Sequence, residues 1–252
     1  MPPTGKIDAL LLDTATAQQA SFELMLSACG ADLPDCDPIE AETAFVARVN
    51  TLLIEEETVT FNAFLNLLSK GIEEIELGQL LAPLLIDYAF NGDPTEMFAV
   101  IDEYDLGEEG QAGDEPERLT LEKAVLCADD EVRPSVESLF TALESLNDSS
   151  DLFAETLLTK AASCVGWPAA MDPVGDIRAM DAPVSLVIGG AADVLTPISW
   201  AAETADALGG VFIESRHLGH TTLFVRQNEC VDTIFLAYLL EGTLPSEGTS
   251  CI

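Results

Sequence analysis

The sequence is poor in basic residues. It has 10 Lys and Arg against 45 Asp and Glu in 252 residues, which gives a formal net charge of −35 at pH 7. Nucleic acid and anionic membrane surfaces repel such a chain, so we expect neither as a partner. A field of this sign favours cationic ligands, and it strains the compact state by self-repulsion that salt relieves.

Two kinds of apolar segment are also missing. The first eight residues, Met1 to Asp8, contain no basic stretch followed by an apolar run, so they do not form a secretory signal. No uncharged apolar run reaches the roughly 18 residues that a membrane span needs. The remaining composition is 48% hydrophobic, which is typical of a folded globular protein.

Two turns in the last third of the chain present a carboxylate and an imidazole. Val184 to Ile188 is an apolar run that leads through a glycine pair, expected as a tight turn, to Asp193, and a second short strand leads to Gly219-His220. An acid followed by a base is the order of two members of a catalytic triad in one class of hydrolase. The alternative interpretation makes Asp193 a helix N-cap ahead of Thr196 and His220 a polar turn residue.

The third triad member, a serine in the pattern G-x-S-x-G, occurs nowhere in the sequence. Ser69-Lys70 lacks the S-x-x-K spacing of another serine nucleophile, and Ser163 adjoins a cysteine. His217 lies three positions before His220, but no acid or cysteine lies in ligand register beside the two. We therefore expect no metal site and no cofactor.

The cysteines point to an oxidising compartment. An even number at such spacings suits a disulfide framework, although six cysteines allow about 15 connectivities and all six could instead be reduced and buried. Secretion-type cysteines without a signal lead us to expect a chain that has lost its front end, with both the signal and the nucleophile. The six are Cys29, Cys36, Cys127, Cys164, Cys230 and Cys251.

Hydrophobic periodicity divides the chain into three parts. Ile7 to Asp13 is a short apolar run that we predict to be a buried parallel strand, and helical periodicity follows to about Asp181. Then strand, helix, strand, helix recur at the spacing of a βαβ unit with a parallel sheet. The helical stripes are Phe22, Met25, Leu26 and Cys29; Phe45, Val49, Leu52 and Leu53; and Phe61, Phe64, Leu65 and Leu68; the final elements are predicted at 183–188, 197–208, 211–214 and 231–238.

Several of these motifs resemble one known family. The runs Ile188-Gly-Gly-Ala-Ala-Asp193, Gly219-His220-Thr221 and the tail from Cys230 to Cys251 closely resemble the C-terminal part of tripeptidyl-aminopeptidase-like serine hydrolases. These are secreted α/β-hydrolases of the prolyl-aminopeptidase group. Leu10 to Asp13 is similar to the strand that follows their nucleophile helix, and the segments around Cys127 and Cys164 are similar to the cysteine motifs of their helical lid.

The resemblance implies an α/β fold, in which a partial α/β-hydrolase sheet carries a large helical lid insertion. It assigns residues 1–14 to a strand of the hydrolase core, 15–181 to the lid and 182–252 to the C-terminal core segment. Asp193 would be the triad acid and His220 the base. The implied disulfides are Cys29–Cys36, Cys127–Cys164 and Cys230–Cys251.

By the same resemblance, the intact parent is an extracellular enzyme that releases short peptides from peptide N-termini. This chain is then its C-terminal portion, inactive alone, with a peptide substrate and an N-terminal complementing segment as partners. The alternatives are a non-catalytic peptide-binding protein that keeps the lid as a surface for cationic peptides, and a fragment without a function of its own.

Overall fold

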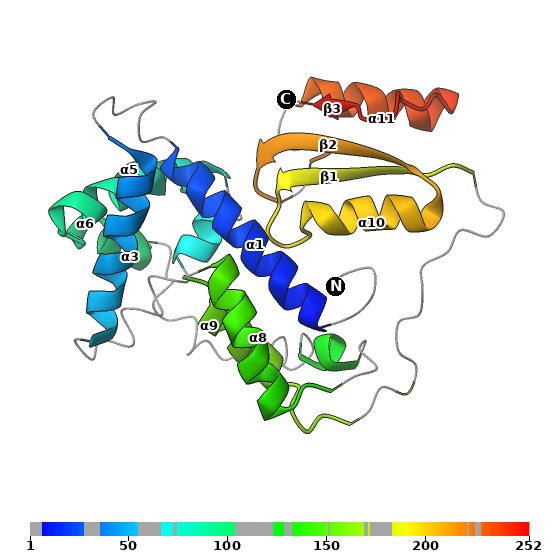
Figure 1. The fold of residues 1–252 in the computed structure, drawn as a ribbon. Helices are drawn as coiled ribbons and strands as arrows, with labels where there is room; N and C mark the ends of the chain where they lie inside the picture. The colour runs from blue at the N-terminus through cyan, green and yellow to red at the C-terminus, as the bar shows by residue number, and fades with distance from the viewer. Residues whose placement is uncertain are drawn as a thin grey trace.

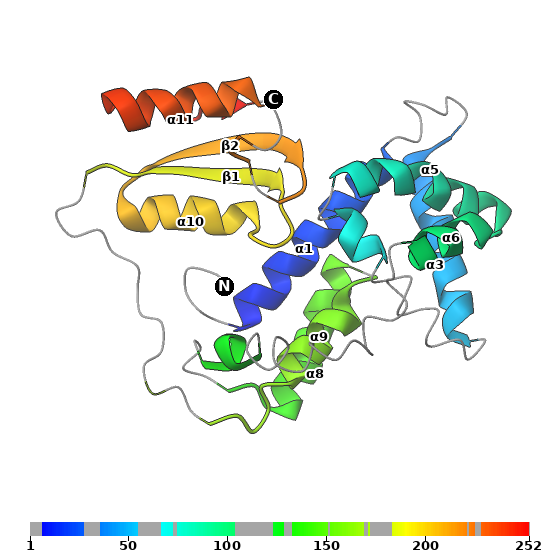
Figure 2. The same cartoon turned by 180° about the vertical axis from the view of Figure 1, so that it is seen from behind.

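The computed structural model describes residues 7–27, 36–54, 67–72, 75–103, 123–128, 133–150, 152–168, 171, 183–220, 222–224 and 228–251. Figures 1 and 2 show two neighbouring parts, a cluster of helices and a small sheet between two helices. Among the described residues, no helix combines the length and the apolar character that a membrane crossing requires.

The helical part contains α1 (Ile7–Leu26), α3 (Pro38–Ile54), α5 (Ile75–Asn91), α6 (Thr95–Glu103), α8 (Val136–Ser149) and α9 (Ala154–Ala162), and residues 67–72 and 123–128 are helical as well. The predicted stripes face its core, since Phe22, Met25, Leu26 and Phe45 are all buried. Leu68 is buried too, whereas the predicted helical residues Phe61 to Leu65 lie outside the described residues.

The first element corrects a prediction. Ile7 to Asp13 is not a strand of a sheet but the beginning of the 20-residue helix α1. Ile7, Leu11 and Ala15 are at most 2% exposed and lie at i, i+4 and i+8, so they continue the apolar stripe that leads to Phe22. A short apolar run is compatible with both a strand and a helix. The residues that follow are rich in Ala and Gln, which have high helix propensity, so they favour the helix.

Aromatic rings join the helices at the centre of this part. The ring of Phe22 on α1 lies 5.2 Å from that of Phe45 on α3 and 6.5 Å from that of Phe153 at the start of α9. Phe45 in turn meets Tyr88 of α5 at 6.1 Å, edge to face. Helix α1 is therefore packed on several sides by its neighbours, and its position is set by the whole cluster.

The sheet part has the predicted βαβ order. It consists of β1 (Leu186–Ala192), α10 (Ile198–Leu208), β2 (Val211–Leu218), α11 (Glu229–Glu241) and β3 (Ser250–Cys251). The three strands lie in the order β1-β2-β3, and both neighbouring pairs are parallel. Helix α10 covers one face of the sheet and α11 covers the other (Figures 1 and 2).

The tight turn that we predicted at the glycine pair begins only at Gly190, whose carbonyl accepts a hydrogen bond from the Asp193 N–H at 3.3 Å. Gly189 lies inside β1, directly against α10, and a Cβ atom built on it would come within 2.7 Å of the Ala201 Cβ. Glycine therefore serves close packing of a helix on the strand. The strand continues to Ala192, with a register irregularity between Gly190 and Ala192 that bends its end.

Two of the predicted disulfides are confirmed. Cys127–Cys164 joins the helical residues 123–128 to the end of α9, and Cys230–Cys251 joins the first turn of α11 to β3. Cys36 is also disulfide-bonded, but its predicted partner Cys29 lies outside the described residues. Among the described residues no cysteine is free, so the reduced alternative is wrong for them.

Candidate functional site

Asp193 follows β1 directly and is held by its own turn. Its Oδ1 accepts hydrogen bonds from the backbone N–H groups of Leu195 (3.0 Å) and Thr196 (2.8 Å), and its Oδ2 accepts one from the Thr196 hydroxyl at 2.7 Å. This is an Asx turn, in which the carboxylate replaces backbone acceptors. The N-cap of α10 is Pro197, so the N-cap interpretation of Asp193 is wrong.

His220 follows β2 and reaches the same carboxylate. Gly219, with a φ of 86°, turns the chain after the strand, and the Nδ1 atom of His220 lies 2.8 Å from Oδ2 and 3.0 Å from Oδ1 of Asp193. A carboxylate accepts hydrogen bonds, so the Nδ1–H of His220 donates a hydrogen bond to Asp193. The two residues that the sequence singled out are therefore paired.

The sheet explains why the two side chains meet. β1 and β2 are adjacent and parallel, and Ala192, the last residue of β1, pairs with Leu218 near the end of β2. Asp193 and His220 thus leave the sheet at the carboxyl ends of neighbouring strands, where sites in open parallel sheets lie. The carboxylate is shielded, with 7% of its side chain exposed, while the imidazole is 42% exposed and accessible from solvent.

Thr196 is a site residue to which the sequence analysis gave no role of its own. Its hydroxyl donates to Asp193 Oδ2 and lies 3.5 Å from His220 Nδ1. The sequence feature that could have identified Thr196 is local: it lies three positions after Asp193, a spacing that lets its hydroxyl bind the carboxylate within the turn. Thr196 therefore helps to fix the orientation of the carboxylate that faces His220.

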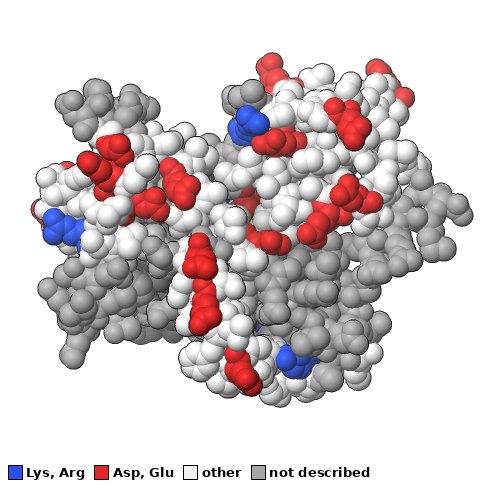
Figure 3. All heavy atoms as spheres, in the orientation of Figure 1, with Lys and Arg blue, Asp and Glu red and all other residues white. Residues whose placement is uncertain are grey.

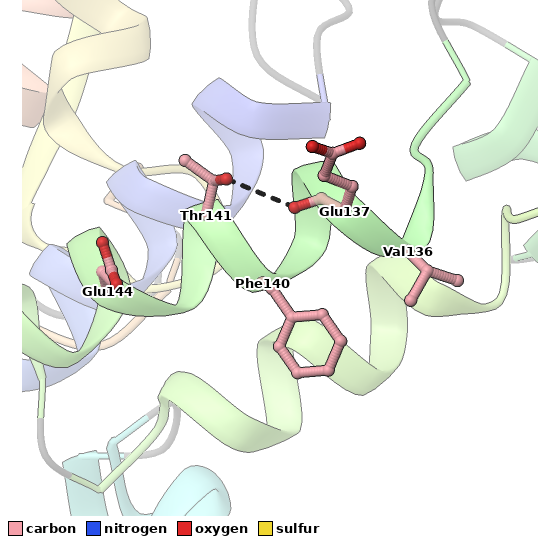
Figure 4. A pocket seen from close by; sticks show the side chains of 5 residues that line it. All are labelled: Val136, Glu137, Phe140, Thr141 and Glu144. Carbon is pink, nitrogen blue, oxygen red and sulfur yellow. Dashed lines mark hydrogen bonds between the residues drawn. The ribbon is translucent and has the colours of Figure 1, made fainter.

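A hollow among the described residues lies away from this pair. A space of about 540 Å³ runs along the outer face of α8, lined by Val136, Glu137, Phe140, Thr141 and Glu144. Figure 4 shows these side chains spread along one helix, with the Thr141 hydroxyl donating to the backbone carbonyl of Glu137. None of the lining residues comes from β1, β2 or the turns after them, so this hollow is not the mouth of the Asp193–His220 pair.

Acidic side chains are spread over the face of the molecule that Figure 3 shows. On the face shown in Figure 3, carboxylates lie over both the helical part and the sheet part, with few basic side chains between them. Within the described ranges, no group of three or more His, Cys, Asp or Glu side chains is arranged to hold a metal ion.

Comparison with known proteins matches the part that carries the pair. Residues 150–251 match the family model described as TAP-like protein, an α/β-hydrolase family. The matched range contains all three strands, Asp193, His220 and the Cys230–Cys251 disulfide, and it confirms the resemblance for this part of the chain. Residues 1–149 lie outside the match. No curated protein matches the chain.

Proposed function

We propose that this chain is the C-terminal portion of an exported serine hydrolase resembling tripeptidyl aminopeptidases, with Asp193 as the triad acid and His220 as the base. One observation carries the proposal: the 2.8 Å hydrogen bond from His220 Nδ1 to a buried carboxylate that is itself held by three further donors. The TAP-like match over residues 150–251 supports the same assignment.

The chemistry follows from this arrangement. With Nδ1 bound to Asp193, the other ring nitrogen, Nε2, is the atom that accepts the proton of a serine hydroxyl as its oxygen attacks the scissile carbonyl carbon. Asp193 holds the tautomer that leaves Nε2 unprotonated, and it stabilises the imidazolium that forms. Nε2 then returns the proton to the leaving amine.

The nucleophilic serine comes from another polypeptide segment, because this chain contains no G-x-S-x-G pattern. We assign the nucleophile to an N-terminal complementing segment, together with the oxyanion-hole donors that accompany the nucleophile in such folds. The isolated chain then has little hydrolytic power. The helical residues up to 181 act as the lid, and 182–252 form the end of the catalytic core.

The proposal includes a class of substrate and a cellular compartment. A peptide with a free N-terminus carries an ammonium group, which the negative field of this chain attracts. The disulfides Cys127–Cys164 and Cys230–Cys251 are compatible with an extracellular protein. We therefore place the release of short peptides from peptide N-termini outside the cell.

The test combines the chain with the polypeptide encoded directly upstream of it. A fluorophosphonate probe should leave the isolated chain unlabelled, and it should label a serine of the complement once the two are mixed. The mixture should also hydrolyse a tripeptidyl-aminomethylcoumarin, and Asp193→Asn should lower kcat by about 10³–10⁴-fold because the imidazole adopts the wrong tautomer.

Asp93→Asn is the matched control, since Asp93 accepts hydrogen bonds from Thr95 in a similar turn before α6. This variant should keep full activity. Covalent labelling of the isolated chain would refute the proposal, and so would a mixture whose kcat does not change in Asp193→Asn. Binding of peptides without any hydrolysis would instead favour the non-catalytic alternative.

A further inference from the structure

Helix α1 is the helix that links the helical cluster to the candidate site. It packs against α3, α5, α8 and α9, and it also contacts the end of β1 from which Asp193 emerges (Figure 1). This contact joins residues that are about 170 positions apart in the sequence. The function proposed above gives α1 no role beyond that of a lid helix.

Two side-chain hydrogen bonds make the contact specific. The hydroxyl of Ser21 on α1, which is fully buried, donates to the backbone carbonyl of Ala192 at 3.2 Å. The indole Nε1–H of Trp200, in the first turn of α10, donates to the Asp13 carboxylate on α1 at 2.6 Å. Ala192 directly precedes Asp193 and Trp200 follows its turn, so both ends of the Asp193 segment are tied to one helix.

The Ala192 carbonyl lies where the sheet is least regular. The register of β1 against β2 shifts between Gly190 and Ala192, so the ladder is disturbed at the last residue before Asp193. Loss of the Ser21 hydroxyl would remove one donor from this buried carbonyl, and we expect the end of the strand to shift as the carbonyl finds another partner. The direction of the Asp193 side chain would then change as well.

We propose that Ser21 and Asp13 are positioning residues, which hold the segment from Ala192 to Trp200 so that the Asp193 carboxylate meets His220 Nδ1. Ser21 acts through the Ala192 backbone, and Asp13 acts through Trp200 on the helix that follows Asp193. The catalytic consequence rests on the proposed function, but the geometric claim does not.

The tautomer of His220 measures this geometry directly. In the ¹⁵N-labelled full chain at alkaline pH, long-range ¹H–¹⁵N spectra distinguish Nδ1–H from Nε2–H, and the only other histidine, His217, is assigned with His217→Gln. The wild type should show Nδ1–H. Asp193→Asn provides the reference spectrum for a lost carboxylate. Ser21→Ala should lose the Nδ1–H preference and move toward that reference.

Ser27→Ala is the matched control. This serine directly follows the last residue of α1, but its hydroxyl donates to the backbone carbonyl of Leu24 in the same helix. Its tautomer should match the wild type. Trp200→Phe, which keeps a ring but removes the indole N–H, provides a second route if Ser21→Ala does not fold, and it should reduce the Nδ1–H preference as well.

A folded Ser21→Ala or Trp200→Phe variant with the wild-type tautomer would overturn the inference. The result is separable from the proposed function, because the measurement needs neither a nucleophile nor a substrate. Absence of fluorophosphonate labelling in the mixture would defeat the hydrolase assignment and leave the tautomer result standing. An unchanged tautomer beside full hydrolysis would defeat only the role of α1.

Discussion

Two aspartates of this chain occupy similar turns and differ in what faces them. Asp93 accepts hydrogen bonds from the backbone N–H and the hydroxyl of Thr95, and Asp193 accepts the same two kinds of bond from Thr196. Asp193 also accepts a hydrogen bond from the imidazole of His220. At the scale of single residues, the partner and not the turn distinguishes the two carboxylates, and the proposed role of Asp193 depends on that partner.

Asp93 makes a pH-dependent contribution to folding. The Thr95 hydroxyl, and then the Thr95 backbone N–H, lower the pKa of the Asp93 carboxyl below its ordinary value because they bind its charged form. Since the folded pKa lies below the unfolded one, the stabilisation is complete above the unfolded pKa and is lost as pH falls through the folded pKa. Asp93→Ala should therefore be less stable than the wild type at pH 7.

Urea midpoints at a series of pH values test this expectation. The difference between Asp93→Ala and the wild type should shrink in acid and disappear once Asp93 is protonated in the folded protein. Asp93→Asn serves as the control, because it keeps the side-chain shape without a titrating group. A difference for Asp93→Ala that stays constant from neutral to acid pH would contradict the assignment.

At the scale of elements, the packing of α10 on β1 depends on the missing side chain of Gly189. A Cβ atom there would lie 2.7 Å from the Ala201 Cβ and 3.1 Å from the Phe212 ring. Ala201 has no flexible side chain that could move aside, so the helix itself would shift away from the strand. That shift would affect the turn between the two elements, which carries Asp193.

Gly189→Ala should destabilise the protein by about 1–3 kcal/mol, the usual cost of overpacking a close contact. Gly209→Ala is the control: nothing lies within 4 Å of its Cβ position, but its φ is +60°, so it isolates a backbone penalty of roughly 1 kcal/mol. Urea unfolding of both variants gives the comparison. If Gly189→Ala were as stable as the wild type, the contact would not limit the spacing of α10 and β1.

At the scale of the whole molecule, charge opposes folding. The net charge is −35, and 10 basic residues are too few to pair 45 acids. Raising the salt concentration from about 0.1 M to about 1 M shortens the Debye length from about 10 Å to about 3 Å, which screens most repulsion between surface carboxylates. The urea midpoint should therefore rise with NaCl.

A variant with Glu137→Gln and Glu144→Gln, two acids along the outer face of α8, should show a smaller rise. Sucrose at equal osmolality separates screening from a general effect of excluded solutes, because it stabilises without screening charge. A urea midpoint that stays flat or falls with NaCl would show that self-repulsion is not a main term in the stability of this protein.

Much of the fold was predictable from local pattern. The stripes through Phe22 and Phe45 predicted helices because apolar residues at a period of 3.6 bury one face, and two cysteine pairs followed from the family resemblance. Ile7 to Asp13 was predicted wrongly, since a short, mostly apolar run fits a buried strand and a buried helix equally well. Gly189 was also predicted wrongly, because the sequence does not distinguish a glycine in a turn from a glycine on which a helix packs.

The sequence by itself determined that Asp193 and His220 lie in the turns that follow two successive strands, because short-range periodicity and turn residues are local features of the sequence. It also determined that no G-x-S-x-G serine is present and that the net charge is negative. The first follows from the order of the residues and the second from their counts. Only the tertiary structure decided that Ser21 and Trp200 join α1 to the segment around Asp193. Contacts between residues this far apart depend on how the helices pack, and no local pattern encodes that.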